Sequence, residues 1–113
     1  MTKMFWRDAK SLYENPRNAD SIFFILFVLE NDLNSRLMKE IVSKVENYFS
    51  KYTIIKFIEI DSIESGLYQV PNTRFQVLET PTFCILKNNT VYDLGHNLYP
   101  KEILIDWLQE AIN

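Results

Sequence analysis

The sequence predicts an α/β fold, with a central mixed sheet of four to five strands and helices on both of its faces. Residues 22–29 are apolar on both sides of a strand, which is typical of a central strand covered by helices on both faces. Residues 53–60 are rich in β-branched side chains, which favour strands. A helical pattern separates these two runs, and this order predicts parallel strands joined by a right-handed crossover.

The first helix is predicted before Asn15. Phe5, Ala9 and Leu12 recur at helical spacing, and Pro16 stops the pattern because proline cannot continue a helix.

A longer helix is predicted between the two buried strands. Asp32 or Ser35 can cap it, because a short oxygen-bearing side chain accepts a hydrogen bond from an unpaired N–H of the first turn. Its apolar stripe consists of Leu33, Leu37, Ile41, Val45, Tyr48 and Tyr52, widened by Met38, Val42 and Phe49.

The second half of the chain predicts a short helix, a hairpin and a closing helix. Asp61 opens a helical segment over residues 63–70, ended by Pro71. Residues 82–87 and 90–95 are two strands joined by two asparagines, which tolerate the left-handed backbone of a tight turn. Pro100 starts the last helix, whose apolar face contains Ile103, Leu104, Trp107, Leu108 and Ala111.

Length and composition predict a single domain over residues 1–113, long enough to bury about 65% of the surface of the unfolded chain. A net charge of −3, with the basic residues scattered, argues against binding to nucleic acid, which needs a clustered basic face. The longest apolar run, residues 22–29, is too short to span a bilayer. One cysteine and no signal peptide lead us to expect a cytoplasmic protein that does not bind membranes.

Several motifs resemble the thioredoxin family. "LETPTF" at residues 78–83, "KNNT" at residues 87–90, Gly95 and the closing amphipathic helix resemble the C-terminal half of thioredoxin. "IEID" at residues 58–61 is similar to a strand of that family which ends in aspartate. The resemblance covers essentially the whole chain and implies a thioredoxin-like fold.

The resemblance also implies the position of the active site. Pro81 falls on the family's cis-proline, and the backbone of Thr80 would then pair with an extended substrate segment. A trans proline that opens a strand is the alternative. The stretch from Asp32 to Ser35 falls on the Cys-x-x-Cys motif, so both active-site cysteines are missing.

Two further family positions carry apolar residues in this chain. The family's buried aspartate falls at Leu26, and its partner lysine falls at Phe57. Dithiol exchange needs an attacking thiolate and a resolving thiol, and the sequence offers neither at this place. We therefore expect no enzymatic activity.

The expected function is that of a redox-inactive module that binds another protein, or a second copy of itself as a homodimer. The expected binding groove consists of Asp32, Leu33, Asn34, Ser35, Thr80, Pro81, Gly95 and His96. Exposed apolar residues beside it, with Leu33, Leu94, Leu98 and Tyr99 as candidates, would mark a partner surface. No cofactor is expected, and no metal, because His96 is the only histidine and lacks accompanying ligands.

The alternative function is a thiol–disulfide oxidoreductase, or a redox-linked protein, that uses the single Cys84. Cys84 lies inside a predicted buried strand, where cysteine usually behaves as a small apolar residue. That position favours core packing over redox chemistry.

Overall fold

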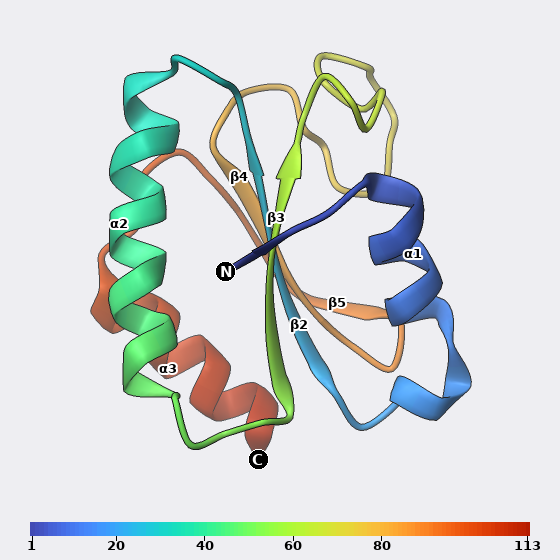
Figure 1. The fold of residues 1–113 in the computed structure, drawn as a ribbon, viewed down its shortest axis with the longest axis vertical. Helices are drawn as coiled ribbons and strands as arrows, with labels where there is room; N and C mark the ends of the chain where they lie inside the picture. The colour runs from blue at the N-terminus through green and yellow to red at the C-terminus, as the bar shows by residue number, and fades with distance from the viewer.

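Five strands form one mixed sheet in the computed structural model, which describes all residues from 1 to 113 (Figure 1). The strand order is β1-β3-β2-β4-β5, in which β3 runs parallel to both β1 and β2, and β4 runs antiparallel to β2 and β5. The strands are β1 (Thr2–Lys3), β2 (Ile22–Val28), β3 (Ile55–Asp61), β4 (Thr82–Lys87) and β5 (Thr90–His96). The predicted mixed sheet is confirmed, and the two-residue β1 is an addition to it.

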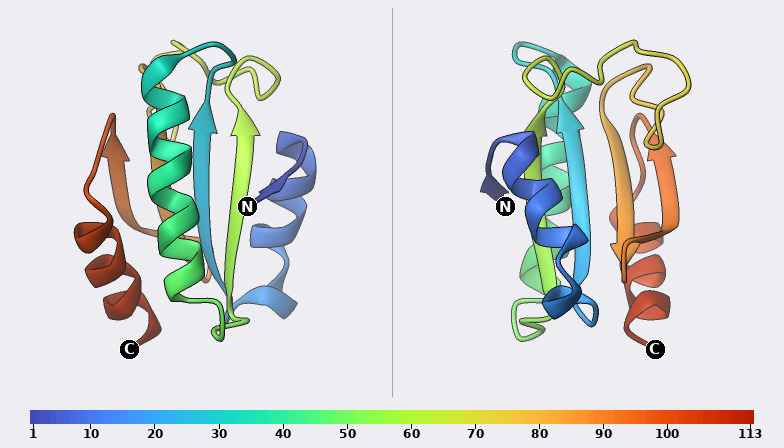
Figure 2. Two further views of the ribbon diagram at one scale, coloured as in Figure 1. Left: turned by 60° about the vertical axis from the view of Figure 1, so that its left-hand side comes forward. Right: turned by 90° about the vertical axis from the view of Figure 1, so that its right-hand side faces the viewer.

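The helices cover both faces of the sheet (Figures 1 and 2). They are α1 (Trp6–Glu14), α2 (Leu33–Tyr48) and α3 (Lys101–Ile112), with a 3₁₀ turn, η1 (Pro16–Asn18), after α1. Buried residues of α2 and α3 share one core, and those of α1 belong to the other. The predicted α/β class is therefore confirmed. None of the three helices combines the length and apolarity needed to cross a membrane.

Strand β2 supplies both cores at once. All seven of its residues are buried, and successive strand side chains point to opposite faces of a sheet. The α2–α3 core receives Ile22, Phe24, Leu26 and Val28, and the α1 core receives Phe23, Ile25 and Phe27.

The buried face of α2 differs from the predicted stripe. Its buried apolar residues are Met38, Val42 and Val45, followed by Phe49 at the C-cap. Leu33 and Tyr48, which we counted among the residues of the stripe, are 61% and 58% exposed. Met38, Val42 and Phe49, which were expected only to widen the stripe, face the sheet together with Val45. The buried face of the helix is therefore rotated relative to the prediction.

The hairpin and the closing helix form as predicted. Asn88 and Asn89 have φ values of 52° and 55°, the left-handed pair that a two-residue turn between antiparallel strands requires. Pro100 precedes the first turn of α3 at the N-cap position.

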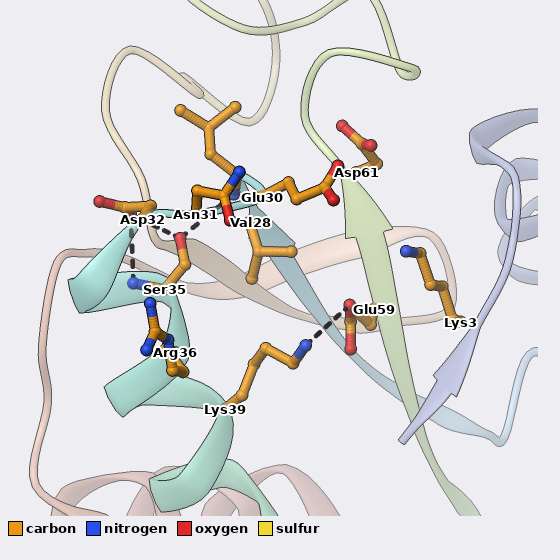
Figure 3. A pocket seen from close by; sticks show the side chains of 11 residues that line it. Lys3, Val28, Glu30, Asn31, Asp32, Ser35, Arg36, Lys39, Glu59 and Asp61 are labelled. Carbon is orange, nitrogen blue, oxygen red and sulfur yellow. Dashed lines mark hydrogen bonds and ion pairs between the residues drawn. The ribbon is translucent and has the colours of Figure 1, made fainter.

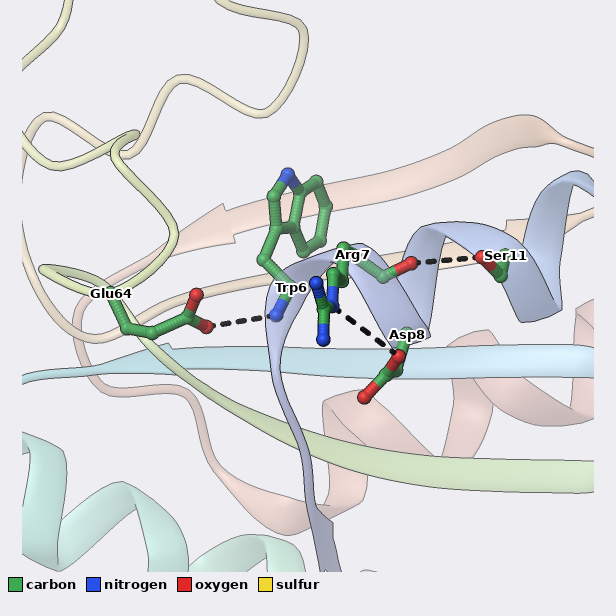
Figure 4. Close-up of polar contacts among 5 residues, drawn as sticks. All are labelled: Trp6, Arg7, Asp8, Ser11 and Glu64. Carbon is green, nitrogen blue, oxygen red and sulfur yellow. Dashed lines mark hydrogen bonds and ion pairs between the residues drawn. The ribbon is translucent and has the colours of Figure 1, made fainter.

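The predicted helix over residues 63–70 is wrong, because the segment closes after one turn. Asp61 Oδ1 accepts a hydrogen bond from Ile63 N at 2.9 Å, so the turn starts where we expected. Gly66 then has φ +71°, a conformation that ends helices. The Glu64 carboxylate instead accepts a hydrogen bond from Trp6 N at 2.8 Å and ties this loop to the start of α1 (Figure 4).

Gly95 of β5 lies against an aromatic cluster of the α2–α3 core. Phe83 is opposite Gly95 in the β4–β5 register, and its ring contacts Tyr99 edge-on at a centroid distance of 5.1 Å. A Cβ atom on Gly95 would lie 2.5 Å from Phe83 Cζ and 3.0 Å from Tyr99 Cε1. The close approach of these rings therefore requires glycine at this position.

We expect Gly95→Ala to lower the free energy of unfolding by about 1–3 kcal/mol, because overpacking moves buried rings out of their preferred positions. Urea denaturation of the variant and the wild type measures the change. In a Phe83→Leu background the same substitution should cost less, because the ring that the new methyl group meets is gone. An equal loss in both backgrounds would show that the ring contact is not the cause.

Candidate functional site

Three segments meet beyond the carboxyl ends of β2 and β3: the start of α2, the loop before β4 and the end of β5 (Figure 1). The Asp32 carboxylate joins the first two of them. Its Oδ2 accepts hydrogen bonds from Ser35 N at 3.1 Å, Ser35 Oγ at 2.6 Å and Thr80 Oγ1 at 3.0 Å. Asp32 is thus the N-cap of α2 and also holds the loop before β4 in place.

The third segment is attached by two hydrogen bonds of Asn97. Its Oδ1 accepts a hydrogen bond from Asn34 Nδ2 at 3.0 Å, and its backbone N–H donates to the carbonyl oxygen of Pro81 at 2.7 Å. The start of α2, the loop before β4 and the loop after β5 are therefore connected in a closed ring of hydrogen bonds.

The hydrogen bonds around Asp32 lower the pKa of its carboxyl group. The Ser35 hydroxyl is the main cause, partial burial opposes it, and the Thr80 hydroxyl and the Ser35 N–H add to the lowering. Each of these donors favours the charged form. Asp32 is consequently a carboxylate at neutral pH.

The Thr80–Pro81 bond is cis, and Pro81 is buried while Thr80 is partly exposed. Neither the N–H nor the carbonyl oxygen of Thr80 forms a hydrogen bond within the chain. A free donor and acceptor on one extended residue are the groups that pair with an added strand.

The hydrogen bonds of Thr82 determine which nitrogen of His96 carries the proton. Thr82 Oγ1 donates to the carbonyl oxygen of Glu79 at 2.7 Å and lies 2.9 Å from His96 Nδ1. A hydroxyl has a single proton, so at the second contact the oxygen accepts and Nδ1 donates. Neutral His96 therefore has its acceptor nitrogen at Nε2.

Exposed leucines lie on all three segments. Leu33 on α2, Leu78 before β4 and Leu98 after β5 are 61%, 52% and 42% exposed. Two other apolar candidates behave differently: Leu94 packs against the α1 core, and Tyr99 packs against Phe83 and Trp107.

The sheet beneath α2 is apolar where the resemblance placed an aspartate and a lysine. Leu26 and Phe57 both belong to the α2–α3 core. The charged pair of this region lies two residues beyond Phe57 on β3, where Lys39 Nζ is 3.3 Å from Glu59 Oε2. Glu59 is the β3 residue opposite Leu26 and is itself buried. Its carboxylate therefore lies beside the apolar core, and the Lys39 side chain reaches it from the more exposed side.

Beside this ion pair lies a polar hollow of about 240 Å³, lined by residues that include Asp32, Lys39, Glu59 and Asp61 (Figure 3). Pockets for small ligands usually measure about 300–1,000 Å³ and are mostly apolar. Only two of its eleven lining residues are hydrophobic. The hollow does not have the character of a cofactor or drug-sized ligand site.

Cys84 lies in the middle of β4 and is fully buried in the α1 core. Burial raises the pKa of its thiol well above the usual range. A reactive cysteine needs an accessible thiolate, and Cys84 meets neither condition in the folded chain.

The eight residues of the expected groove all lie on these three segments, yet they differ in exposure. Ser35, Pro81 and Gly95 are buried, and Leu33 is well exposed. The others are partly exposed, namely Asp32, Asn34, Thr80 and His96. Sequence reasoning missed Asn97 and Leu78. Asn97 has φ +67°, and an asparagine after a strand is the one signal that could have indicated such a turn.

We expect Asp32→Ala to lower the free energy of unfolding by about 1 kcal/mol, because the N-cap acceptor is lost. Asp32→Asn should cost less, because an amide oxygen can still accept the same bonds. Urea denaturation over a range of pH measures both.

The difference in the free energy of unfolding between the wild type and Asp32→Asn should change with pH in one direction. The pKa of Asp32 is lowered in the folded state, so its charge stabilises the wild type above the unfolded-state pKa. That contribution disappears as the pH falls through the folded-state pKa. The difference between the wild type and Asp32→Asn should therefore shrink in acid, and a constant difference would contradict the assignment.

Comparisons with known proteins agree with this geometry. The chain is 24% identical over 111 residues to a thioredoxin of Mycoplasmopsis pulmonis (strain UAB CTIP), and the match covers 97% of each chain. No family model matches the chain.

Solved structures with the same fold include three thioredoxins. That of Trypanosoma brucei brucei has a TM-score of 0.78 at 14% identity and matches 99% of this chain and 90% of its own. For chloroplastic thioredoxin z the TM-score is 0.77 at 12% identity, with 98% and 93% covered. For Fasciola hepatica thioredoxin it is 0.68 at 18% identity, with 99% and 96% covered. Together with the arrangement around Asp32 and Pro81, these similarities show that the chain has the thioredoxin fold.

Proposed function

We propose that this protein binds extended segments of other proteins, without thiol–disulfide exchange, on the surface formed by the segments of Leu33, Thr80 and Leu98, which we call the groove. The single observation that carries the proposal is the free backbone N–H and carbonyl oxygen of Thr80. Thr80 lies on one of three segments that are joined by hydrogen bonds and that each expose a leucine. Backbone pairing would supply affinity, and the leucines would supply contacts to side chains.

The groups that would be needed for redox chemistry are missing from the groove. Asp32 and Ser35 occupy the ends of the loop motif, and their oxygen atoms hydrogen-bond to each other. Neither is a thiol, and Leu26 and Phe57 provide no proton acceptor below them. The groove in this proposal is a binding site from which the chemistry has been lost.

In this proposal the segment that binds in the groove belongs to a separate protein. The alternative is a segment of a second copy of this chain. The setting is the cytoplasm, where a lone thiol stays reduced, and the chain acts as one domain. Light scattering of the purified protein separates the two cases, because a homodimer formed through the groove would be present without any partner.

We expect Cys84 to react with iodoacetamide at least about 100-fold more slowly in the native protein than in urea, because a buried thiol reacts only through opening of the fold. Insulin reduction in the presence of dithiothreitol should not exceed the rate with dithiothreitol alone. Fast native labelling together with accelerated insulin reduction would favour the redox function through Cys84.

The groove itself can be tested by selecting a phage-displayed library of random linear peptides against the wild-type protein. We expect the selected peptides to bind Leu33→Ser at least about tenfold more weakly, since an exposed apolar contact is lost. Tyr48→Ser is the matched control: Tyr48 is 58% exposed, close to the 61% of Leu33, and lies at the other end of α2. If the library yields no binders, or binders that lose affinity equally in both variants, the groove is not the binding site.

A further inference from the structure

We propose that the groove selects segments that carry a lysine or arginine facing Asp32, flanked by apolar residues that contact the exposed leucines. This inference rests on the proposed function and adds the chemistry of the partner. The second carboxylate oxygen of Asp32 is the acceptor that would receive the cation.

The two oxygens of Asp32 have different surroundings. Oδ2 accepts all three hydrogen bonds, from two donors of Ser35 and one of Thr80. Oδ1 has no hydrogen-bond partner in the chain, and Figure 3 shows one carboxylate oxygen turned away from Ser35. Because the Oδ2 bonds fix the side chain, the direction in which Oδ1 can accept is fixed as well.

The structural bonds of Asp32 all use Oδ2, and its charge strengthens them, but they leave Oδ1 unused. Capping needs only an acceptor, and asparagine, aspartate and serine cap about equally well. The Thr80 hydroxyl likewise needs only an acceptor. Compared with the amide of asparagine, a carboxylate supplies one more acceptor oxygen. Charge-assisted hydrogen bonds to it are about twice as strong as neutral ones.

No cation of the chain itself occupies this position. The three ion pairs of the protein are Met1–Glu46, Arg7–Asp8 and Lys39–Glu59, and none includes Asp32. Two further carboxylates beside the groove segments, Glu30 and Glu79, are exposed and likewise form no ion pair. Arg36 lines the same hollow as Asp32 but forms no ion pair with it. The complement that we propose for these carboxylates and the exposed leucines is a basic and apolar segment.

Thr80 connects the two parts of the proposed recognition, which are backbone pairing and the contact with the Asp32 carboxylate. Its hydroxyl is bound to Asp32 Oδ2 at 3.0 Å, and its backbone groups are free. A segment that pairs with this backbone must therefore pass close to the Asp32 carboxylate. Alternate residues of an extended segment point to the same side, so one can face Asp32 while its neighbours face the leucines.

The test uses the peptides selected from the phage-displayed library of random linear peptides described above. Among binders whose affinity depends on Leu33, we expect lysine or arginine at one aligned position. A synthetic peptide of this class should bind Asp32→Asn about tenfold more weakly than the wild type. Glu40→Gln is the matched control, because it removes one exposed, unpaired carboxylate from the outer side of the same helix.

The outcomes separate this inference from the proposed function. Leu33-dependent binders without a basic position, or with one that Asp32→Asn leaves unaffected, would overturn the inference and leave the groove standing. An equal loss in Asp32→Asn and Glu40→Gln would also overturn it, because overall charge would then be the cause. Absence of any Leu33-dependent binder would reject the groove itself.

Discussion

The burial of β2 on both faces is the constraint on which the rest of the structure depends. Each large apolar side chain removed from water contributes about 1.5–3 kcal/mol, and all seven residues of β2 are buried. Their gross contribution is comparable to the whole net stability of a domain, about 5–15 kcal/mol. Helices must therefore cover both sides of this strand, and α2 has to begin just beyond its carboxyl end. That requirement places Asp32 next to the loop that carries Thr80.

The same constraint explains the apolar character beneath the groove. A charged group on the inward side of β2 would need a partner in the core, since an isolated buried charge costs several kcal/mol. Leu26 avoids that cost and packs with Phe57, Phe24 and Phe83 in one core. The one carboxylate beside this core, that of the buried Glu59, is paired with Lys39, whose side chain is 44% exposed. The core thus gains apolar packing at the place where thiol chemistry would need a proton acceptor.

The elements that could be predicted from sequence are those with a local physical cause. Apolar runs on both faces indicated β2 and β3, two asparagines indicated the hairpin turn, and Asp32 was one of two candidates for the cap. The two failures have different causes. β1 consists of Thr2 and Lys3 and exists only because it pairs with β3, which is a non-local cause. After Asp61 the cause is local, because Gly66 closes a turn where a helix was expected. The groove residues were named from the resemblance, while the bonds of Asp32 to Thr80 and of Asn34 to Asn97 join residues far apart in sequence and needed the structure.

The closed ring of hydrogen bonds around the groove also concerns the thermodynamics and rate of association. Loops that become ordered only on binding lose conformational entropy at that step. This loss lowers the affinity for a given contact area. Here Asp32, Asn34 and Asn97 immobilise all three loops when the chain folds. If a partner binds there as proposed, only the incoming segment would have to become ordered. Association is then expected to proceed as a single encounter step, whose rate rises linearly with ligand concentration and shows no slower conformational phase.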